Sequence, residues 1–407
     1  MSRVFVRNFH LSHISKLNSA YIIAAGRSPI ANFNGALKTV SATDLGAQVV
    51  KAVVARSGVK PVDVEEAYIG QVIQAGAGQA PARQVVLKAG LPDTTEATTI
   101  NKVCASGLKS VALATQSIWL GDASVVLAGG TESMSQTPYY LPRTLGFGHT
   151  PTKDSILHDA LTDVYNKIHM GSCCENTNRR ENVSREDQDN FSVESYRRSL
   201  ETIKNGGFKD EIIPITVHSK KGDVIFSEDE SPGSVNLERL PKLRPAFEKD
   251  GSVTAGNSSS LNDGAAALVL ASGDKAKELH TPVLAKVIAY ADAATAPIDF
   301  TIAPSFAIPK LLKKAGLKVE DIAKWELNEA FAGVSVANAR RLGLDPSKVN
   351  VKGGAVALGH PIGASGARIV VTLINVLKDG EYGVAAICNG GGAATALLIK
   401  KVSKVEE

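Results

Sequence analysis

Two stretches of this sequence occur twice, in the same order and at nearly the same spacing. The segment beginning at Gly58 (GVKPVDVEEAYIGQV) resembles the one beginning at Gly316 (GLKVEDIAKWELNEA), at an offset of 258 residues. The segment beginning at Cys104 resembles the one beginning at Gly363, at an offset of 259 residues. Similarity at a fixed period indicates a duplicated structural unit. The chain is therefore predicted to contain two similar halves that pack as pseudo-symmetric domains.

Each repeated unit has the pattern of alternating helices and strands. The first pair reads as the end of a helix, a turn containing Asp, and then a strand. The second pair shares the tripeptide A-S-G, followed by a helical apolar pattern, a turn with Gly, a β-branched run and a glycine cluster. Strands that alternate with helices favour βαβ units and a parallel or mixed sheet. We therefore predict an α/β fold.

A dissimilar stretch, from about residue 136 to 256, is richer in charge and turn residues. A helix is expected to begin after Ser184, because Asp187 completes a capping-box pattern, and to end at Asn205-Gly206-Gly207. We predict that this stretch is a loop domain inserted in an N-terminal half of residues 20–283, with the C-terminal half at 284–407. Inserted loops often carry substrate contacts.

Composition excludes several classes of protein. The chain has 407 residues, with 45 Lys and Arg against 41 Asp and Glu, and this near balance argues against a nucleic-acid partner. No run of 18 apolar residues occurs, so no membrane insertion is predicted. The four cysteines contain no C-x-x-C pair, which argues against a disulfide framework and against zinc.

The first 19 residues differ from the rest. They contain Arg3, Arg7 and Lys16, four serines and no acidic residue, and the first acid of the chain is Asp44. A basic, Ser-rich, acid-poor amphipathic segment is typical of a mitochondrial transit peptide. We predict a transit peptide at residues 1–19 and a location in the mitochondrial matrix. The alternative is a basic N-terminus without a targeting role.

Cys104 is the candidate nucleophile. It follows a short β-rich run and opens a predicted helix at Ala105. A thiol at a helix N-terminus faces unpaired N–H groups and the positive end of the helix dipole. These groups lower a thiol pKa, so we expect a thiolate at neutral pH. The alternative is a buried structural cysteine.

Three further residues are candidates for the same site. His360 precedes the second repeated helix, so pseudo-symmetry can bring it to Cys104, and a nucleophilic Cys needs such a base. Cys388 ends a strand and enters the glycine loop 389–392, whose N–H groups can approach a ligand closely. Asn328 follows a strand and points toward the crevice of an α/β sheet. The alternatives are a structural His, a core Cys and a helix-capping Asn.

Two glycine-rich segments lack the features of nucleotide sites. The segment Gly76–Pro81 lacks the third glycine of a dinucleotide fingerprint, and Gly359–Gly366 lacks the Gly-Lys-Ser/Thr of a phosphate-binding loop. NAD and ATP are therefore not predicted as cofactors.

Four motifs in this order resemble the thiolase superfamily over nearly the whole chain after residue 20. They are Asn101–Gly107 (NKVCASG), Asn328–Ala332 (NEAFA), Gly359–Arg368 (GHPIGASGAR) and Cys388–Gly392 (CNGGG). Four further segments resemble the mitochondrial acetyl-CoA acetyltransferases within it: Tyr165–Thr177, Pro241–Phe247, Leu261–Leu270 and Ala291–Pro304. The sequence His169-Met170-Gly171 favours the short-chain, biosynthetic-type branch. The resemblance implies a five-layer αβαβα thiolase fold.

The resemblance also implies a reaction. Two acetyl-CoA molecules would condense reversibly to acetoacetyl-CoA and CoA, with thiolysis of acetoacetyl-CoA and 2-methylacetoacetyl-CoA in ketone body metabolism, isoleucine degradation and fatty acid oxidation. Cys104 would be acylated, His360 would take its proton, and Cys388 would act as acid and base at the α-carbon. His360 and a water held by Asn328 would serve the enolate oxygen. The N–H groups of Cys104 and Gly390 would serve the acyl-enzyme oxygen.

Binding residues follow from the same resemblance. Coenzyme A would contact His169, Met170, Tyr196, Arg239, Arg244, Phe247 and Ser259. A potassium ion would be held by Tyr196, Ala255, Gly256, Ser258 and Val356. Four residues depart from close relatives: Gly256 and Ser258 replace alanines, Arg239 replaces a lysine, and Thr301 replaces the proline of relatives that cleave the 2-methyl substrate.

The resemblance implies a homo-oligomer, with a homotetramer predicted. The loop Ser135–Leu157 would join dimers through Tyr139, Tyr140, Leu141 and Phe147; the alternative is a mobile loop with exposed aromatic residues. Two other functions compete with the predicted one. A ketoacyl synthase of the same fold would lack a second reactive cysteine such as Cys388. A non-catalytic acyl-CoA-binding protein would tolerate the loss of Cys104, His360 or Cys388, and all three are present.

Overall fold

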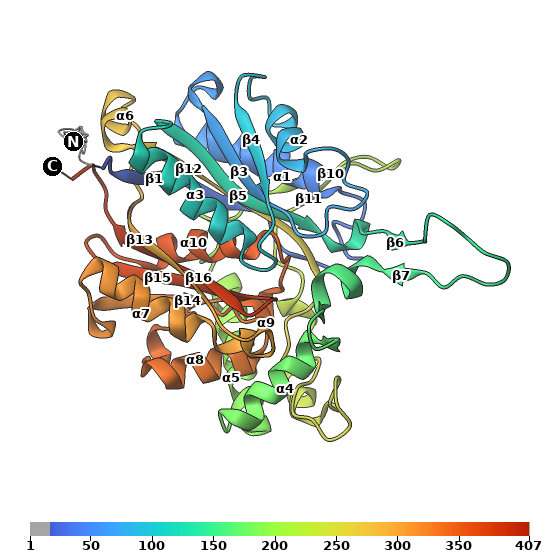
Figure 1. The fold of residues 1–407 in the computed structure, drawn as a ribbon. Helices are drawn as coiled ribbons and strands as arrows, with labels where there is room; N and C mark the ends of the chain where they lie inside the picture. The colour runs from blue at the N-terminus through green and yellow to red at the C-terminus, as the bar shows by residue number, and fades with distance from the viewer. Residues whose placement is uncertain (1–16, 407) are drawn as a thin grey trace, which may run out of the picture.

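The computed structural model describes residues 17–406 and has two halves that share one arrangement of four strands (Figure 1). In the first half the strands run in the order β1 (Ala20–Arg27), β12 (Asn262–Ser272), β5 (Val125–Ser133), β3 (Glu66–Gly70) and β4 (Glu96–Ile100). In the second half the order is β13 (Ala285–Ala294), β16 (Ala393–Lys401), β15 (Tyr382–Asn389) and β14 (Ile322–Leu327). In each half the first two pairings are antiparallel and the next is parallel. The predicted pseudo-symmetry is confirmed.

A short pairing joins the two halves. Strands β1 and β13 pair only at Tyr21 with Lys286 and at Ile22 with Ala285, which makes one continuous path of strands. The same irregularity occurs in both halves, because the register shifts after Ile22 in β1 and after Val287 in β13. A bulge bends and twists a strand. The duplication therefore extends to details of strand geometry.

Five layers result from the helices that cover these strands. The central layer holds α3 (Ser106–Leu120) and α10 (Ser365–Val376), which lie between the two parts of the sheet (Figure 1). The outer layers hold α1 (Ala42–Ser57) and α2 (Pro81–Lys88) on one side and α7 (Pro304–Ala315) and α8 (Ala332–Leu342) on the other. This arrangement is the predicted αβαβα fold.

The repeated glycines end equivalent helices. Gly58 follows α1 and Gly316 follows α7, and both adopt left-handed backbone conformations, with φ of 71° and 67°. Glycine is favoured there because it has no Cβ to clash. A short 3-10 turn then leads into β3 in the first half and β14 in the second. This is the order of elements that the first repeat predicts.

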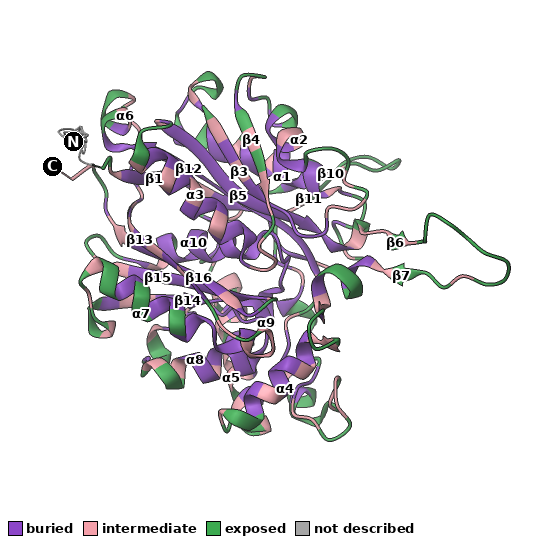
Figure 2. Ribbon diagram, in the orientation of Figure 1, coloured by how far each residue is buried: buried purple, intermediate pink, exposed green. Residues whose placement is uncertain are grey.

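The hydrophobic core lies between the layers of sheet and helix. Strands β5 and β12 are buried along their whole length, as are the facing sides of α3 and α10 (Figure 2). Apolar side chains of both halves meet in one cluster around these two helices. Full burial of one large aliphatic side chain contributes roughly 1.5–3 kcal/mol. The core therefore packs around the two central helices, and Cys104 and His360 lie just before their N-terminal ends.

The segment between β5 and β12 contains the elements outside the two repeated units. It begins with a hairpin arm, β6 (Tyr139–Tyr140) and β7 (Lys153–Asp154), and continues through a π-helix, β8 (Thr162–Asp163) and β9 (Ile168–His169). Helices α4 (Met170–Arg180) and α5 (Arg185–Lys204) follow, then β10 (Ile215–Val217) and β11 (Val224–Phe226). The capping box of Ser184 and Asp187 is present at the start of α5, as predicted.

Apart from short 3-10 helices, the other described elements are β2 (Ala31–Asn32), α6 (Gly273–Glu278) and α9 (Ala355–Leu358). No helix within residues 17–406 is both long enough and apolar enough to span a bilayer. Residues 1–16 of the predicted transit peptide lie outside the described residues.

Candidate active site

A cavity of about 420 Å³ lies where the two halves meet the inserted segment. Cys104 comes from the first half and His360 from the second, so the two candidates that the repeat predicted to meet share one cavity. His169, Met170, Phe247 and Ser259 also line it. The other walls are mainly apolar and are formed by Met134, Leu157, Ala160, Leu161, Ala246, Ala255, Ser258, Ser260, Leu261, Phe300, Ala330, Phe331 and Ile362.

Cys104 is presented by a strained turn. The preceding residue, Val103, has φ of 47°, a left-handed conformation that is a genuine outlier for a β-branched side chain. The turn is fixed by two hydrogen bonds: the Val103 N–H donates to Asn101 Oδ1 at 3.0 Å, and Ser106 Oγ donates to the Val103 carbonyl at 2.6 Å. Such strain persists only where surrounding contacts over-determine the backbone. The thiol is therefore held in one direction at the start of α3.

The expectation of a Cys104 thiolate at neutral pH is wrong. Burial raises the pKa of this thiol to about 11, although the N–H groups of Gly390 and of Cys104 itself act in the opposite direction. The donors that the sequence predicted are present, but removal from water outweighs them. Cys104 is therefore a thiol in the free protein, and it needs a base before it can act as a nucleophile.

His360 is the candidate for that base, because it lines the same cavity as Cys104. Its Nδ1 lies 2.6 Å from Ser365 Oγ, and Ser365 Oγ donates to the Pro361 carbonyl at 3.0 Å. This pattern assigns the ring hydrogen to Nδ1 and leaves the lone pair on Nε2, which lies 3.4 Å from Asn328 Nδ2. Burial, with a smaller effect from Arg368, lowers the pKa of His360 to about 3. The imidazole is therefore neutral in the free protein.

Cys388 lies behind the cavity wall at the end of β15, as predicted from the sequence. It is 1% exposed and packs against Met170 and Phe300. Burial and the neighbouring Cys104 raise the pKa of Cys388 well above its ordinary value. A β-carbon on Gly390 would lie 3.5 Å from both Met170 Cε and Val103 Cγ1. The glycine loop therefore lies directly against the turn that carries Cys104.

Four of the seven residues predicted to bind coenzyme A line the cavity. The His169 ring stacks on Phe247 with centroids 4.6 Å apart, and its Nδ1 accepts the Gly171 N–H at 3.0 Å. Burial lowers the pKa of His169, so this ring is a neutral, flat wall. Ser259 Oγ donates to the Ala330 carbonyl at 2.8 Å. Met170 is the fourth of these residues.

The other three predicted contacts lie outside this cavity. Arg239 is exposed on a 3-10 helix, and Arg244 is exposed on the loop that follows it and leads to Phe247. Tyr196 is buried in a separate cluster with Leu240 and Val356. The predicted set is thus divided among an apolar slot, an exposed cationic segment and a separate buried cluster.

Three of the five residues predicted to hold potassium, Tyr196, Gly256 and Val356, lie around Leu240, and the other two, Ala255 and Ser258, line the cavity that contains Cys104. Tyr196 and Val356 pack on Leu240, and a β-carbon on Gly256 would lie 2.9 Å from Leu240 Cγ. The carbonyls of Ala255 and Gly256 accept no hydrogen bond from any described residue. Burial and the nearby Glu329 raise the pKa of Tyr196 to about 12. Free carbonyl oxygens, a hydroxyl and an adjacent buried carboxyl fit a hard cation that prefers oxygen donors.

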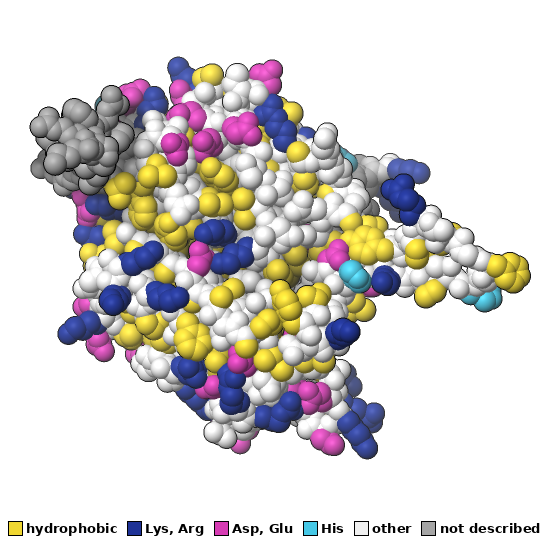
Figure 3. Space-filling view, in the orientation of Figure 1, with side chains coloured by type: hydrophobic (Ala, Val, Ile, Leu, Met, Phe, Trp, Pro, Cys, Tyr) yellow, Lys and Arg dark blue, Asp and Glu magenta, His cyan; other side chains and the backbone are white. Residues whose placement is uncertain are grey.

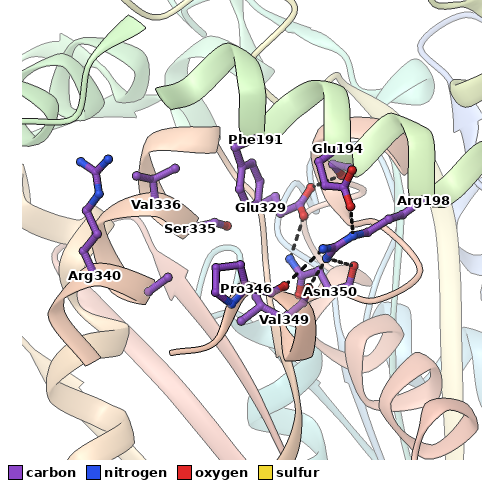
Figure 4. Close-up of a pocket in the computed structure, with 12 residues that line it drawn as sticks. Phe191, Glu194, Arg198, Glu329, Ser335, Val336, Arg340, Pro346, Val349 and Asn350 are labelled. Carbon is purple, nitrogen blue, oxygen red and sulfur yellow. Dashed lines mark hydrogen bonds and ion pairs between the residues drawn. The ribbon is translucent and has the colours of Figure 1, made fainter. Parts of the chain in front are cut away.

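Glu329 of the NEAFA motif borders a second cavity, of about 260 Å³, between α5 and α8 (Figure 4). Its carboxyl accepts hydrogen bonds from Asn350 Nδ2 at 2.7 Å, from Ser195 Oγ at 2.7 Å and from the Val356 N–H at 3.0 Å. This cavity shares no lining residue with the one that contains Cys104. Glu329 therefore ties the segment that carries Val356 to α5.

Sequence reasoning missed two polar groups beside the cavity. Ser365, which orients His360, belongs to the repeated A-S-G tripeptide, so its motif was visible but its role was not. Glu132 is buried at the end of β5 and accepts the N–H groups of Val72, Ile73 and Gly363 at 3.0, 3.3 and 3.0 Å. An acid after the small and apolar residues of β5 was the available signal. Glu132 ties both halves together beneath Cys104.

Known proteins agree with this architecture. The family models "Thiolase, N-terminal domain" and "Thiolase, C-terminal domain" match residues 20–274 and 281–401. An acetyl-CoA acetyltransferase of Yarrowia lipolytica is 65% identical over 97% of this chain and 99% of its own length. A mitochondrial acetyl-CoA acetyltransferase of Bos taurus is 51% identical over 98% of this chain and 95% of its own length.

Solved structures agree as well. The Acat5 thiolase of Ascaris suum, in complex with coenzyme A, superposes with a TM-score of 0.91 at 46% identity, over 94% of this chain and 100% of its own. The acetyl-CoA acetyltransferase of Bacillus anthracis superposes with a TM-score of 0.92 at 42% identity, over 95% and 100%. On its motifs, its two matched domains and its fold, the chain belongs to the thiolase family of acyltransferases.

Proposed function

We propose that this chain is an acetyl-CoA C-acetyltransferase, which condenses two acetyl-CoA molecules to acetoacetyl-CoA and CoA and catalyses the reverse thiolysis. The observation that carries the proposal is the meeting of Cys104 and a neutral His360 in one cavity, with Cys388 behind it. The names of the relatives from Yarrowia lipolytica and Bos taurus support the same reaction.

The first half-reaction acetylates Cys104. His360 Nε2 takes the thiol proton, and the thiolate attacks the acetyl carbonyl of acetyl-CoA. The tetrahedral oxygen accepts hydrogen bonds from the N–H groups of Cys104 and Gly390, and each such donor contributes roughly 3–4 kcal/mol in known sites. The intermediate then releases the CoA thiolate, which takes the proton of Cys388. Acetyl-Cys104, protonated His360 and a Cys388 thiolate remain.

The second half-reaction forms the carbon–carbon bond. The Cys388 thiolate removes the α-proton of a second acetyl-CoA, and the resulting enolate attacks acetyl-Cys104. Acetoacetyl-CoA leaves, and the released Cys104 thiolate regains its proton from His360. Asn328 supports the enolate step, because its buried Oδ1 has no hydrogen-bond partner among the described residues and can hold a water beside His360.

Coenzyme A is assigned to the cavity and the loop beside it. Its acyl and pantetheine parts suit the apolar slot formed by His169, Met170, Phe247 and Ser259. Arg239 and Arg244 are exposed cations on the segment that leads to Phe247 and suit phosphate groups, whereas Tyr196 is buried in the separate cluster around Leu240. The Ascaris suum neighbour, in complex with coenzyme A, supports this ligand. Potassium would bind at Tyr196, Ala255, Gly256, Ser258 and Val356 and stiffen the loop that forms this wall.

Substrate range depends on the wall formed by Phe300. The adjacent Thr301 is fully buried, its hydroxyl meets that of Thr177, and its carbonyl accepts Asn338 Nδ2 at 2.7 Å. These bonds hold the segment without the fixed φ of proline. We therefore propose that 2-methylacetoacetyl-CoA is also cleaved. Roles in ketone body metabolism, isoleucine degradation and fatty acid oxidation follow from these substrates.

The proposed location is the mitochondrial matrix and the proposed assembly is a homotetramer. The basic leader and the mitochondrial names of relatives support the location. The arm of β6 and β7 supports the assembly, because it projects from the body with exposed Tyr139, Leu141 and Phe147 (Figure 3). Exposed apolar groups on such an arm are typical of an interface.

Steady-state thiolysis tests the proposal. The full chain is assayed with acetoacetyl-CoA, 2-methylacetoacetyl-CoA and 3-ketohexadecanoyl-CoA, with and without potassium. Turnover of the first two, raised by potassium, is expected. Preference for the long chain would overturn the short-chain assignment, and acyl-CoA binding without turnover would favour the non-catalytic alternative.

A further inference from the structure

A buried ion pair joins helix α10 to strand β14, close to the residues that contact His360. Arg368 Nη1 lies 3.4 Å from Glu326 Oε2, and the two side chains are 2% and 1% exposed. Neither residue lines the cavity that contains Cys104. The pair therefore has no direct contact with a substrate in that cavity.

The pair connects the two elements that hold the two nitrogens of His360. Arg368 follows Ser365 by three residues on α10, so the two side chains share a helix face, and Ser365 meets Nδ1. Glu326 precedes Asn328 by two residues at the end of β14, and Asn328 meets Nε2. The ion pair therefore connects α10 to the end of β14 directly, and His360 connects the same two elements through its hydrogen bonds to Ser365 and Asn328.

We propose that Arg368 and Glu326 are positioning residues for His360, which set the spacing between α10 and the end of β14 and place a fixed positive charge beneath the imidazole. This inference rests on the proposed role of His360 as the base for Cys104. Neither residue is assigned a chemical step. Their effect reaches the reaction through the direction of Nε2 and through the proton affinity of the ring.

Among the charged groups around the ion pair, Arg368 is the one that affects the pKa of His360. Arg368 faces Glu326, Glu211, Glu329 and Arg27, and Glu326 faces Arg368, Glu211, Glu329 and Lys352. Arg27 has its own partner, since it contacts Asp229 at 2.7 Å. Beyond burial, Arg368 is the group that lowers the pKa of His360. Its charge therefore favours the neutral form of the imidazole.

Stability alone is a poor explanation for this pair. Removal of two charges from water is costly, and well-packed apolar side chains often replace a buried ion pair without loss of stability. The geometry here is also incomplete, because Arg368 Nε and Glu326 Oε1 are buried without a hydrogen-bond partner among the described residues. A pair that is costly to bury and lies next to a catalytic group is better explained by what it does to that group.

The test compares thiolysis of acetoacetyl-CoA by wild type, R368M, R368K and E326L between pH 4 and 8. For R368M we expect kcat to fall about 10- to 100-fold, the usual effect of a misplaced catalytic group, with KM within about twofold of wild type. We also expect a new acid limb in kcat/KM, because His360 becomes easier to protonate. R368K keeps the charge and should lack the acid limb. E326L should lower kcat, because it removes the acceptor of the Arg368 Nη1 hydrogen bond that holds the spacing.

Two further variants separate positioning from folding. The double variant R368M/E326L replaces the pair with apolar side chains and should fold with wild-type resistance to urea, yet retain the kcat loss and the acid limb. R341M breaks an ion pair with Glu181 on the outer helix α8 and should leave both unchanged. Wild-type kcat and pH profile in R368M, or in the double variant, would overturn the positioning role. Full activity of H360N would instead overturn the proposed function.

Discussion

Gly107 and Gly366, the glycines of the two A-S-G tripeptides, lie against each other where α3 crosses α10. A β-carbon on Gly366 would lie 3.1 Å from the carbonyl carbon of Gly107 and 2.3 Å from the Leu108 nitrogen. A β-carbon on Gly107 would lie 2.8 Å from the Ala367 nitrogen. The two backbones are in direct contact at this crossing. The contact brings together the start of α3, which Cys104 precedes, and the start of α10, which His360 precedes.

Replacement of Gly366 by alanine should therefore destabilise the fold. The added methyl group meets backbone atoms, which cannot rotate away, so we expect a loss of about 1–3 kcal/mol or more. Urea unfolding measures the change. Gly233→Ala is the matched control, because a β-carbon there meets nothing within 4 Å. Equal stability of the two variants would contradict the close crossing.

Alkylation of Cys104 should depend steeply on pH. Its pKa is raised to about 11, and only the thiolate reacts, so the rate with iodoacetamide should rise about tenfold per pH unit between pH 7 and 9. Mass spectrometry of the labelled peptide measures the rate, and acetyl-CoA should protect the site. A rate that is already at its plateau at pH 7 would support the thiolate expected from the helix start alone.

Protonation of His360 should couple stability to pH. The native pKa is lowered to about 3, whereas a histidine in the unfolded chain titrates near 6.5. As the pH falls below about 6.5, the unfolded state binds a proton that the native state does not, so the free energy of unfolding falls. The difference is about 2 kcal/mol at pH 5 and is absent above pH 7.

The matched variant for this prediction is His360→Asn, compared with wild type by urea unfolding at pH 5 and 7. Its loss of stability between these two pH values should be smaller by that amount. An identical loss in both proteins would show that His360 is already protonated at pH 5.

Relief of the backbone strain at Val103 should preserve or raise stability and lower activity. Val103→Gly removes the cost of φ at 47°, which is of order 1–3 kcal/mol for such conformations, so its stability should equal or exceed that of wild type. The turn also becomes free to move, so kcat should fall while the protein stays folded. Unfolding and thiolysis assays on one preparation measure both effects. Val72→Gly, at an unstrained buried position, is the control and should only destabilise.

The arm should control assembly and leave chemistry intact. Phe147 is fully exposed at the arm, so Phe147→Asp should weaken contact between copies without a change in the fold. Light scattering after size exclusion should show a tetramer in wild type and a smaller species in the variant, with similar kcat per chain. An unchanged mass would exclude Phe147 from the interface.

Much of the architecture was readable from local patterns. The repeat at 258–259 residues predicted two equivalent halves, because the same helix ends and strand starts recur in both. Gly58 and Gly316 mark helix ends through their positive φ, and Ser184 marks the start of α5 through its cap. Such signals depend on neighbours within a few residues, which is why a sequence reveals them.

The candidate active site was likewise only partly predictable from local sequence patterns. The sequence by itself determined which groups are present at the helix starts and strand ends: Cys104, His360, Asn328 and Cys388. Only the tertiary structure decided their state. Burial by segments far apart in the chain raises the Cys104 pKa and lowers that of His360, because loss of water acts on a charge more strongly than nearby N–H donors do. The pairing of Arg368 with Glu326 likewise exists only once α10 packs on β14.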